Sequence, residues 1–375
     1  MFPVIKVAGS AYERGHQYGA RARPGIERSL TSYAEVFQHF AGWDWQRATA
    51  EARRFLPSIE DFAPWYAEEL RGIAAGARVD LADILALNVR TEVIFSARVR
   101  DASAARLRAP EECSAFASVS PDEHVVVGQN WDWIPYARDT VVVLESVPDD
   151  GPAFVTVVEA GLLAKLGVNS DGLAVMTNAL ACTEDQGEPA IPYHVMLRAL
   201  LDCSTTDEAV DQLRQARRSS SANYLIADRS GSAVDVEARP GGADKLHLVG
   251  PDDRGVLLHT NHFVSPEFDG VDYTTLMPST SRFRLAQVVE TVDGSEDPTG
   301  PAVFAEALTD HTDHPDSVCR HPDPSLPWPE QSLTVASVLI DLTDRRVQIS
   351  EGPPCESGYE ELDSSVLRGL PDPAI

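Results

Sequence analysis

The residues best suited to chemistry are Cys113 and Asp132, which lie nineteen positions apart in the stretch ECSAFASVSPDEHVVVGQNWDW, Glu112 to Trp133. A cysteine thiolate is a strong nucleophile, and a carboxylate can hold a thiol or an amine in position beside it. The runs SAFASVS and HVVVGQNW flank the turn residues PDE, which predicts an antiparallel hairpin. The stretch therefore predicts a nucleophile at the head of one strand and a carboxylate near the end of the next.

The register of this hairpin decides whether the two side chains meet. A four-residue turn from Pro121 to His124 would place Cys113 opposite Asp132. Opposed residues have Cβ atoms about 5 Å apart, so the carboxylate would hold the cysteine or its backbone amine in position. A bulge would shift the pairing by one residue. In the alternative interpretation Cys113 is a small core residue and Asp132 is a turn residue at a strand end.

The remaining chain predicts the elements that position this hairpin. From about Ser10 to Arg106 apolar residues recur at helical spacing and are interrupted at Pro57, Pro64 and Gly76, which predicts three or four helices. Further helical patterns run from about Tyr193 to Arg217 and from Ser279 to Thr309. Near Arg108 to Glu111 the composition changes from helical patterns to short β-branched runs. This is the only boundary between segments of different composition that the sequence indicates.

After this boundary, short β-branched runs separated by turn residues predict antiparallel hairpins and meanders. The runs are SAFASVS, HVVVGQNW, TVVVLESV, AFVTVVEA, AKLGV, LAVMTNA, NYLIAD, AVDVEA, VLLHTNHF, LTVASVLIDL and VQISEG. Strands in two groups with helices outside both predict an α+β chain in which two sheets pack face to face under helices.

Composition and charge restrict the classes of partner. The chain has 31 Lys and Arg against 58 Asp and Glu, a formal charge of −27, which repels nucleic acid and anionic lipid. The N-terminus has no signal-peptide pattern, and no run approaches the roughly 20 apolar residues that span a bilayer. We therefore expect a cytoplasmic protein with a small-molecule partner. Five cysteines without CxxC pairs favour neither a disulfide framework nor a zinc ribbon.

A rival site lies in the loop DHTDHPDSVCRH. His311, His314, Cys319 and His321 lie within eleven residues and are all capable ligands of zinc or iron. A metal-dependent hydrolase is therefore an alternative, and His259 and His262 in LLHTNHF provide two more imidazoles. The loop lacks the HExxH helix spacing of metalloproteases, which weighs against this alternative.

Several motifs, taken together in their order, resemble the acyl-coenzyme A:6-aminopenicillanic acid acyltransferase family, also called peptidase family C45, in the N-terminal-nucleophile hydrolase superfamily. They are GSAYERGHQYG, ECSAFA, GQNWDW, NSDGLAVMTNAL, SANYLIAD with VDVEARP, HTNHF, DH with SVCRH, LTVASVLID and EGPPC. The resemblance covers most of the chain. Similar DH and CRH elements are structural in that family, so the resemblance implies no metal and no cofactor.

The resemblance implies a four-layer αββα sandwich of two antiparallel sheets. It also implies that the chain cuts itself between Glu112 and Cys113. Residues 1–112 would then form a mostly helical α-subunit and residues 113–375 the catalytic β-subunit, which stay associated as one structural domain. Relatives commonly have Gly before the nucleophile, whereas this chain has Glu112, whose size and charge can slow or prevent the cut.

The implied chemistry starts from a free N-terminal cysteine. Its α-amine has a pKa of about 7.7 to 8.0, so it can act as the base for its own thiol. Asn178 in VMTNAL and Asn261 in HTNHF match asparagines that relatives place near the nucleophile, where an amide can stabilise the oxyanion. The alternative is that each asparagine caps a turn at a strand end.

Three further residues are candidates for substrate contacts. Trp131 and Trp133 flank Asp132, and Arg282 in STSRF resembles an arginine that choloylglycine hydrolases keep near the active site. A surface salt bridge is the alternative for Arg282. The same hydrolases often carry Arg where this chain has Gln129, which argues against bile salts as substrates.

We therefore expect an N-terminal cysteine amidase or N-acyltransferase that acts on a linear amide of a small molecule through a Cys113 thioester. Its partners would be the amide or acyl donor and its own two cleaved chains, with a homo-oligomer left open. Coenzyme A enters only by analogy with the family, because no phosphate-binding Gly loop is visible. The alternatives are the metal-dependent hydrolase and a catalytically silent member of the fold.

Overall fold

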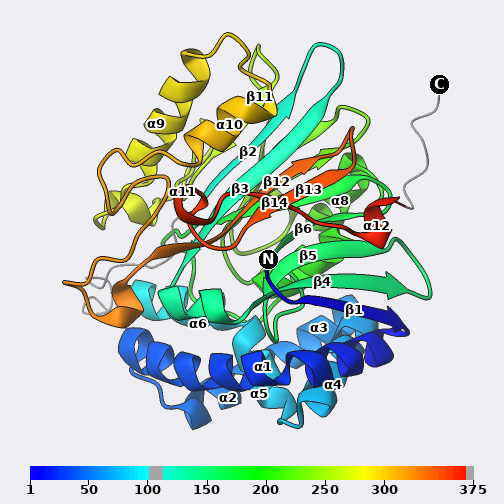
Figure 1. Ribbon diagram of the computed structural model, residues 1–375. Coiled ribbons are helices and arrows are strands. Elements are labelled where there is room, and N and C mark those ends of the chain that lie inside the picture. Colours follow the sequence, from blue (N-terminus) through cyan, green and yellow to red (C-terminus); the bar gives the residue numbers. More distant parts are fainter. Residues whose placement is uncertain (101–112, 369–375) are drawn as a thin grey trace.

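The computed structural model describes residues 1–100 and 113–368, in which two β-sheets lie among helices (Figure 1). The first sheet has the strand order β1-β4-β5-β6-β7-β8-β9-β10 and the second the order β11-β2-β3-β12-β13-β14. The strands are β1 (Val4–Gly9), β2 (Ser114–Val119), β3 (Val125–Trp133), β4 (Val141–Pro148), β5 (Phe154–Glu159), β6 (Leu166–Asn169), β7 (Leu173–Ala179), β8 (Ala222–Asp228), β9 (Ala233–Ala238), β10 (Leu246–Val249), β11 (Val256–His259), β12 (Leu333–Asp341), β13 (Arg346–Ser350) and β14 (Glu360–Glu361).

Among the strands of residues 1–100 and 113–368, every pair is antiparallel except one. β1 pairs in parallel with β4, so the prediction of two wholly antiparallel sheets is wrong at this edge. β1 comes from the N-terminal end of the chain, more than 130 residues before β4, and a long connection of this kind permits parallel pairing.

The helices are α1 (Ala11–Ala41), α2 (Trp45–Ala52), α3 (Leu56–Phe62), α4 (Pro64–Ala77), α5 (Leu81–Asn88), α6 (Arg90–Arg100), α7 (Tyr193–Leu200), α8 (Thr206–Gln215), α9 (Ser281–Asp293), α10 (Pro301–Ala307), α11 (Pro354–Ser357) and α12 (Ser365–Arg368). Residues 1–100 contain six α-helices rather than three or four, because helices also end where no break was predicted: α1 ends at Gly42, which has a left-handed φ of 64°, and α5 ends at Val89 before α6. Among the described residues, none of the helices combines the length and the hydropathy that a membrane-spanning segment needs.

Helices α1 and α4 pack at very short range. Four glycines line their contact, namely Gly15, Gly19, Gly72 and Gly76. A Cβ added at Gly15 or Gly76 would lie only 2.1 Å from a backbone oxygen of the facing helix, so no larger residue fits there. Gly15 and Gly19 of the motif GSAYERGHQYG therefore serve the packing of the helical block.

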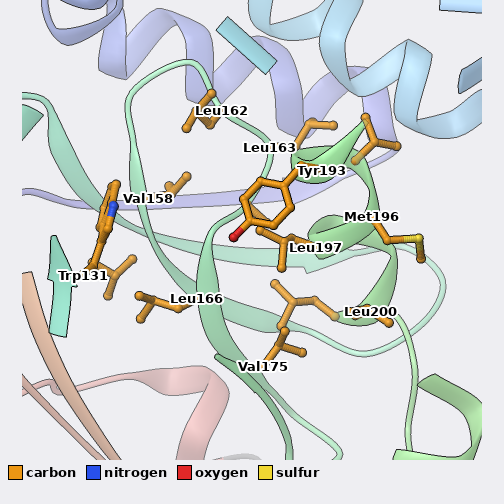
Figure 2. Close-up of a cluster of buried hydrophobic side chains, with 14 of the residues drawn as sticks. Trp131, Val158, Leu162, Leu163, Leu166, Val175, Tyr193, Met196, Leu197 and Leu200 are labelled. Carbon is orange, nitrogen blue, oxygen red and sulfur yellow. The ribbon is translucent and has the colours of Figure 1, made fainter. Parts of the chain in front are cut away.

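The two sheets pack face to face, and helices cover their outer faces. The side chain of Gln129 in β3 bonds to both the backbone oxygen (2.6 Å) and the N–H (2.8 Å) of Thr177 in β7, which links the sheets directly. Figure 2 shows part of the core, where Trp131 of β3 lies in the same cluster as Leu166 and Tyr193.

Outside the first sheet, α8 packs against β8 and β9. Outside the second sheet, α9 packs against β11 and α10 against β12. Phe116 of β2 stacks on Phe304 of α10 with 3.8 Å between ring centroids, which marks this outer face. The α+β class with two packed sheets under helices is confirmed.

Candidate active site

The hairpin that carries Cys113 is formed by β2 and β3, but its register differs by one residue from the predicted one. Ser114 pairs with Asn130. Continuing the ladder by one residue places Trp131, not Asp132, opposite Cys113. The predicted pairing of Cys113 with Asp132 is therefore wrong.

The geometry of the turn explains the shift. The N–H of Ser120 donates to the backbone oxygen of His124 and the N–H of Glu123 donates to that of Ser120, both at 2.9 Å. Glu123 has a φ of 63°, the left-handed conformation that closes a three-residue hairpin loop. The loop is thus one residue shorter than the predicted turn. Because side chains alternate along a strand, the shift moves the Asp132 side chain to the face opposite that of Cys113.

The carboxylate of Asp132 lies on the outer side of the second sheet. Its Oδ1 accepts a hydrogen bond of 2.7 Å from Oγ1 of Thr334 in the neighbouring strand. On the same face, Asn130 donates to the backbone oxygen of Val318 at 3.0 Å. The Cys113 Sγ lies 3.9 Å from the backbone oxygen of Asp132. The backbone of Asp132, and not its side chain, therefore lies next to the Cys113 sulfur.

A buried polar cluster surrounds the carbonyl of Cys113. Nδ2 of Asn178 donates to this oxygen at 3.2 Å, and a guanidinium nitrogen of Arg284 donates to it at 2.8 Å. The other terminal nitrogen of Arg284 donates to Oδ1 of Asn261 at 2.9 Å. All four residues are at most 6% exposed. The structure thus brings together Cys113, Asn178 and Asn261, and adds an arginine that the sequence analysis missed.

Arg284 reaches the cluster because of its place on α9. The buried residues of this helix include Ser281, Arg284, Val288 and Val292, which repeat at helical spacing. This spacing was the signal in the sequence that could have identified Arg284. The predicted residue, Arg282, is two positions away on another side of the helix. Its side chain is 53% exposed, lies 3.6 Å from Asp272 and donates to Oγ1 of Thr274.

The two tryptophans predicted for substrate contacts are each 1% exposed. Nε1 of Trp133 donates to the hydroxyl of Tyr33 at 2.8 Å, and the guanidinium of Arg90 lies 4.7 Å from the Trp133 ring. The ammonium of Lys165 lies 5.8 Å from the ring of Trp131, which packs in the core shown in Figure 2. In this structure both rings make core contacts.

A second polar network extends from Asn178 on the side away from Cys113. Nδ2 of Asn223 donates to Oδ1 of Asn178 at 3.3 Å and to Oδ1 of Asp235 at 2.7 Å. Burial raises the pKa of Asp235 from its ordinary 3.8 to about 6. Burial opposes the charged form of the neighbouring His259, but its hydrogen bond of 2.8 Å with Glu237 raises the pKa above the ordinary value. The orientation of Asn178 is thus coupled to buried titratable groups.

The predicted metal ligands come together in part. His311, Cys319 and His321 lie close to one another and to Cys355, and we call these four residues the His/Cys cluster. His314 is not one of the four, although its ring centroid lies 5.1 Å from that of His321.

The other two histidines considered in the sequence belong elsewhere. His259 bonds to Glu237, and Nδ1 of His262 lies 2.7 Å from Oγ of Ser281. Burial lowers the pKa of His262 to about 3. Glu112 and the bond predicted to be cut lie outside the described residues.

Comparisons with known proteins identify the family of the chain. Residues 119–356 match the family described as acyl-coenzyme A:6-aminopenicillanic acid acyl-transferase. The chain is 24% identical, over 93% of its length and 92% of the relative's, to an acyl-coenzyme A:6-aminopenicillanic-acid-acyltransferase 40 kDa form from Emericella nidulans.

Two solved structures are also similar. One is a mutant conjugated bile acid hydrolase from Clostridium perfringens, with a TM-score of 0.45 and 14% identity over 67% of this chain and 92% of that chain. The other is a penicillin V acylase from Agrobacterium tumefaciens, with a TM-score of 0.41 and 18% identity over 64% of this chain and 83% of that chain.

Proposed function

Because the chain belongs to the acyl-coenzyme A:6-aminopenicillanic acid acyl-transferase family, we propose that it is an N-terminal cysteine amidase or N-acyltransferase acting on a linear amide of a small molecule. The observation that carries the proposal is the buried cluster in which Asn178 and Arg284 both donate to the carbonyl of Cys113. Burying amide and guanidinium groups costs desolvation free energy. Beside a nucleophile, such donors can stabilise the negative charge that develops during the reaction.

Maturation would begin at the bond before Cys113. The Cys113 sulfur attacks the carbonyl carbon of Glu112, the C–N bond breaks, and the acyl group moves from nitrogen to sulfur as a thioester. Water then hydrolyses the thioester. This frees the backbone carboxylate of Glu112 as a new C-terminus and leaves Cys113 with a free thiol and a free α-amine. Residues 1–112 and 113–375 would then be two chains of one enzyme.

Turnover would use the same sulfur. The α-amine of Cys113 takes the thiol proton, and the thiolate attacks the substrate's amide carbonyl to give a tetrahedral oxyanion. Collapse breaks the C–N bond, the proton leaves with the amine product, and the acyl group stays as a thioester. Water then gives hydrolysis, whereas an acceptor amine gives acyl transfer.

We assign the surrounding side chains to three tasks. In the structure Nδ2 of Asn178 donates to the carbonyls of Cys113 and His259, and Nδ2 of Asn261 to that of Ala179. With substrate bound, these amides would turn to donate to the oxyanion, and each such donor is worth about 3 to 4 kcal/mol in acyl transfer. Arg284 is a positioning residue, because it bonds to both the Cys113 carbonyl and the Asn261 side chain. Asp132 would hold the strand end beside Cys113 through its bond to Thr334.

The experiment starts with intact mass and N-terminal sequencing of the purified full-length chain. We expect two polypeptides, the second beginning at Cys113, and a single uncut chain for Cys113→Ala. Cys203→Ser is the matched control, because Cys203 is a buried thiol in another part of the fold and its replacement should leave the cut unchanged.

A screen of N-acyl amides, amino-acid conjugates and β-lactams, followed by amine release, then tests turnover. Adding acceptor amines to the same assay separates hydrolysis from acyl transfer. A verified, cleaved protein that is inactive on every class would contradict the enzymatic proposal. An uncut chain that is also inactive would support the catalytically silent alternative.

A further inference from the structure

The His/Cys cluster has the composition of a metal site. Its four members come from two segments: His311, Cys319 and His321 lie in the loop between α10 and β12, and Cys355 lies in α11. Their ligand atoms all lie within 4.8 Å of one another. We propose that they bind a zinc ion in a structural site that joins this loop to α11.

The distances between the ligand atoms fit tetrahedral coordination. With Zn–S of about 2.3 Å and Zn–N of about 2.0 to 2.1 Å, a tetrahedron has edges of about 3.3 Å between nitrogens, 3.6 Å between nitrogen and sulfur, and 3.8 Å between sulfurs. Nε2 of His311 lies 3.1 Å from Nε2 of His321, and the two sulfurs lie 3.5 Å apart. Nε2 of His321 lies 3.4 Å from the Cys355 sulfur and 3.9 Å from the Cys319 sulfur.

The surroundings hold two of the ligands in place. Nδ1 of His321 lies 3.4 Å from a carboxylate oxygen of Glu356, a contact that orients the ring and leaves Nε2 for the metal. The backbone of Cys319 is held on both sides, because its N–H donates to the Asp310 oxygen at 2.9 Å and its oxygen accepts from Ser317 Oγ at 2.6 Å.

The ligand set indicates a structural rather than a catalytic role. Four protein ligands complete a tetrahedron, whereas catalytic zinc keeps a position open for water or substrate. Two thiolates balance the charge of Zn²⁺, and binding releases the two thiol protons to solvent. The metal-dependent hydrolase that the loop sequence suggested is therefore not the activity that we infer from this cluster.

The loop that the metal would anchor supports the end of strand β3. Val318, the residue before Cys319, accepts a hydrogen bond from Asn130 at its backbone oxygen. Arg320, the residue after Cys319, donates its N–H at 2.9 Å to Oγ1 of Thr334, which in turn donates to Asp132. A metal at Cys319 would thus stiffen the contacts behind the proposed active site without touching the substrate.

The test is elemental analysis of tag-free, full-length protein purified without chelators after expression with zinc. We expect about one zinc per chain in the wild type. The key variant is Cys355→Ser, because Cys355 is exposed and its loss should not prevent folding. It should lose the zinc, whereas Cys203→Ser, which changes a thiol outside the cluster, should keep it.

Two further measurements sharpen the result. Cobalt added to the metal-free protein should give the intense visible absorption of a tetrahedral thiolate complex in the wild type and lose it in Cys355→Ser. A chelator should lower the Tm of the wild type and of Cys203→Ser but leave Cys355→Ser unchanged. Zinc well below one per chain, equal zinc in Cys355→Ser, or a Cys319–Cys355 disulfide found by mass spectrometry would overturn the proposal.

Discussion

Replacing the amide of Asn178 by a carboxylate tests the proposed oxyanion site most directly. In Asn178→Asp the Oδ1 atom that accepts from Asn223 is kept, whereas the Nδ2 donor to the carbonyls of Cys113 (3.2 Å) and His259 (3.4 Å) becomes an oxygen. Two hydrogen bonds are lost and oxygen faces oxygen, so we expect the free energy of unfolding to fall by about 2 to 4 kcal/mol. Loss of the donor should lower the acylation rate by about 100- to 1000-fold.

The matched control is Asn169→Asp. Asn169 is equally buried, its Nδ2 also donates to two backbone oxygens, those of Leu201 (3.1 Å) and Cys203 (2.6 Å), and its Oδ1 accepts from the Leu173 N–H. Its replacement should therefore reduce stability by a similar amount and leave the acylation rate of the folded protein unchanged.

Urea unfolding measures the stability of each variant. The burst of p-nitrophenol from a p-nitrophenyl acyl ester measures acylation of Cys113, under conditions in which circular dichroism shows every variant folded. Equal rates in wild type and Asn178→Asp, or equal losses of rate in the Asn178 and Asn169 variants, would refute the oxyanion role.

Three further predictions concern the surroundings of the site and the helical block. Arg284→Met removes the hydrogen bonds that Arg284 donates to Cys113, Ser114 and Asn261, and should lower the free energy of unfolding by about 3 to 5 kcal/mol in urea titrations. The exposed control Arg282→Met should lower it by less than about 1 kcal/mol. Similar losses of stability in the two variants would argue against the buried cluster. Burial raises the pKa of Asp235 from 3.8 to about 6, so between these pH values the folded protein keeps a proton that the unfolded chain loses. The stability of the wild type relative to Asp235→Asn should therefore fall as the pH rises across this interval, by about 3 kcal/mol in total. Thermal melts in which this relative stability rises with pH would contradict the raised pKa. Gly19→Ala places a Cβ 2.1 Å from a backbone oxygen of α4 and should destabilise the protein by about 2 to 3 kcal/mol in calorimetry. The control is Gly294→Ala, because Gly294 has an ordinary φ of −78°. This variant should change the stability by no more than about 0.5 kcal/mol.

Local patterns predicted the elements well, because most depend on residues near in sequence. The runs LAVMTNA and NYLIAD form β7 and β8, and both later helical blocks are present as α7 with α8 and α9 with α10. Strand β1 was missed, since a single edge strand pairs with a partner far along the chain and carries a weak alternating pattern.

The site required information that single patterns do not contain. Glu123 adopts a left-handed conformation that no residue type in PDE strongly demands, so the register of the hairpin could not be derived from the turn sequence. Cys355 lies 34 positions after His321, and only the fold brings its sulfur to the other three ligands. Arg284 was the exception, because its helical spacing with Ser281 and Val288 was already visible in the sequence.

The parallel pairing of β1 with β4 affects how the larger part of the chain, residues 113–375, can fold. Of the strands that the structure describes, only β1 covers the open side of β4, and β1 is itself the edge of the eight-stranded sheet. If the chain is cut before Cys113, the strand that protects this edge belongs to the small piece and the strand it protects to the large one. Residues 113–375 produced alone would expose the backbone donors and acceptors of β4, a template for aggregation. Folding as an intact precursor would therefore let β1 cover the edge of β4 before any cut, and so protect residues 113–375 from aggregation.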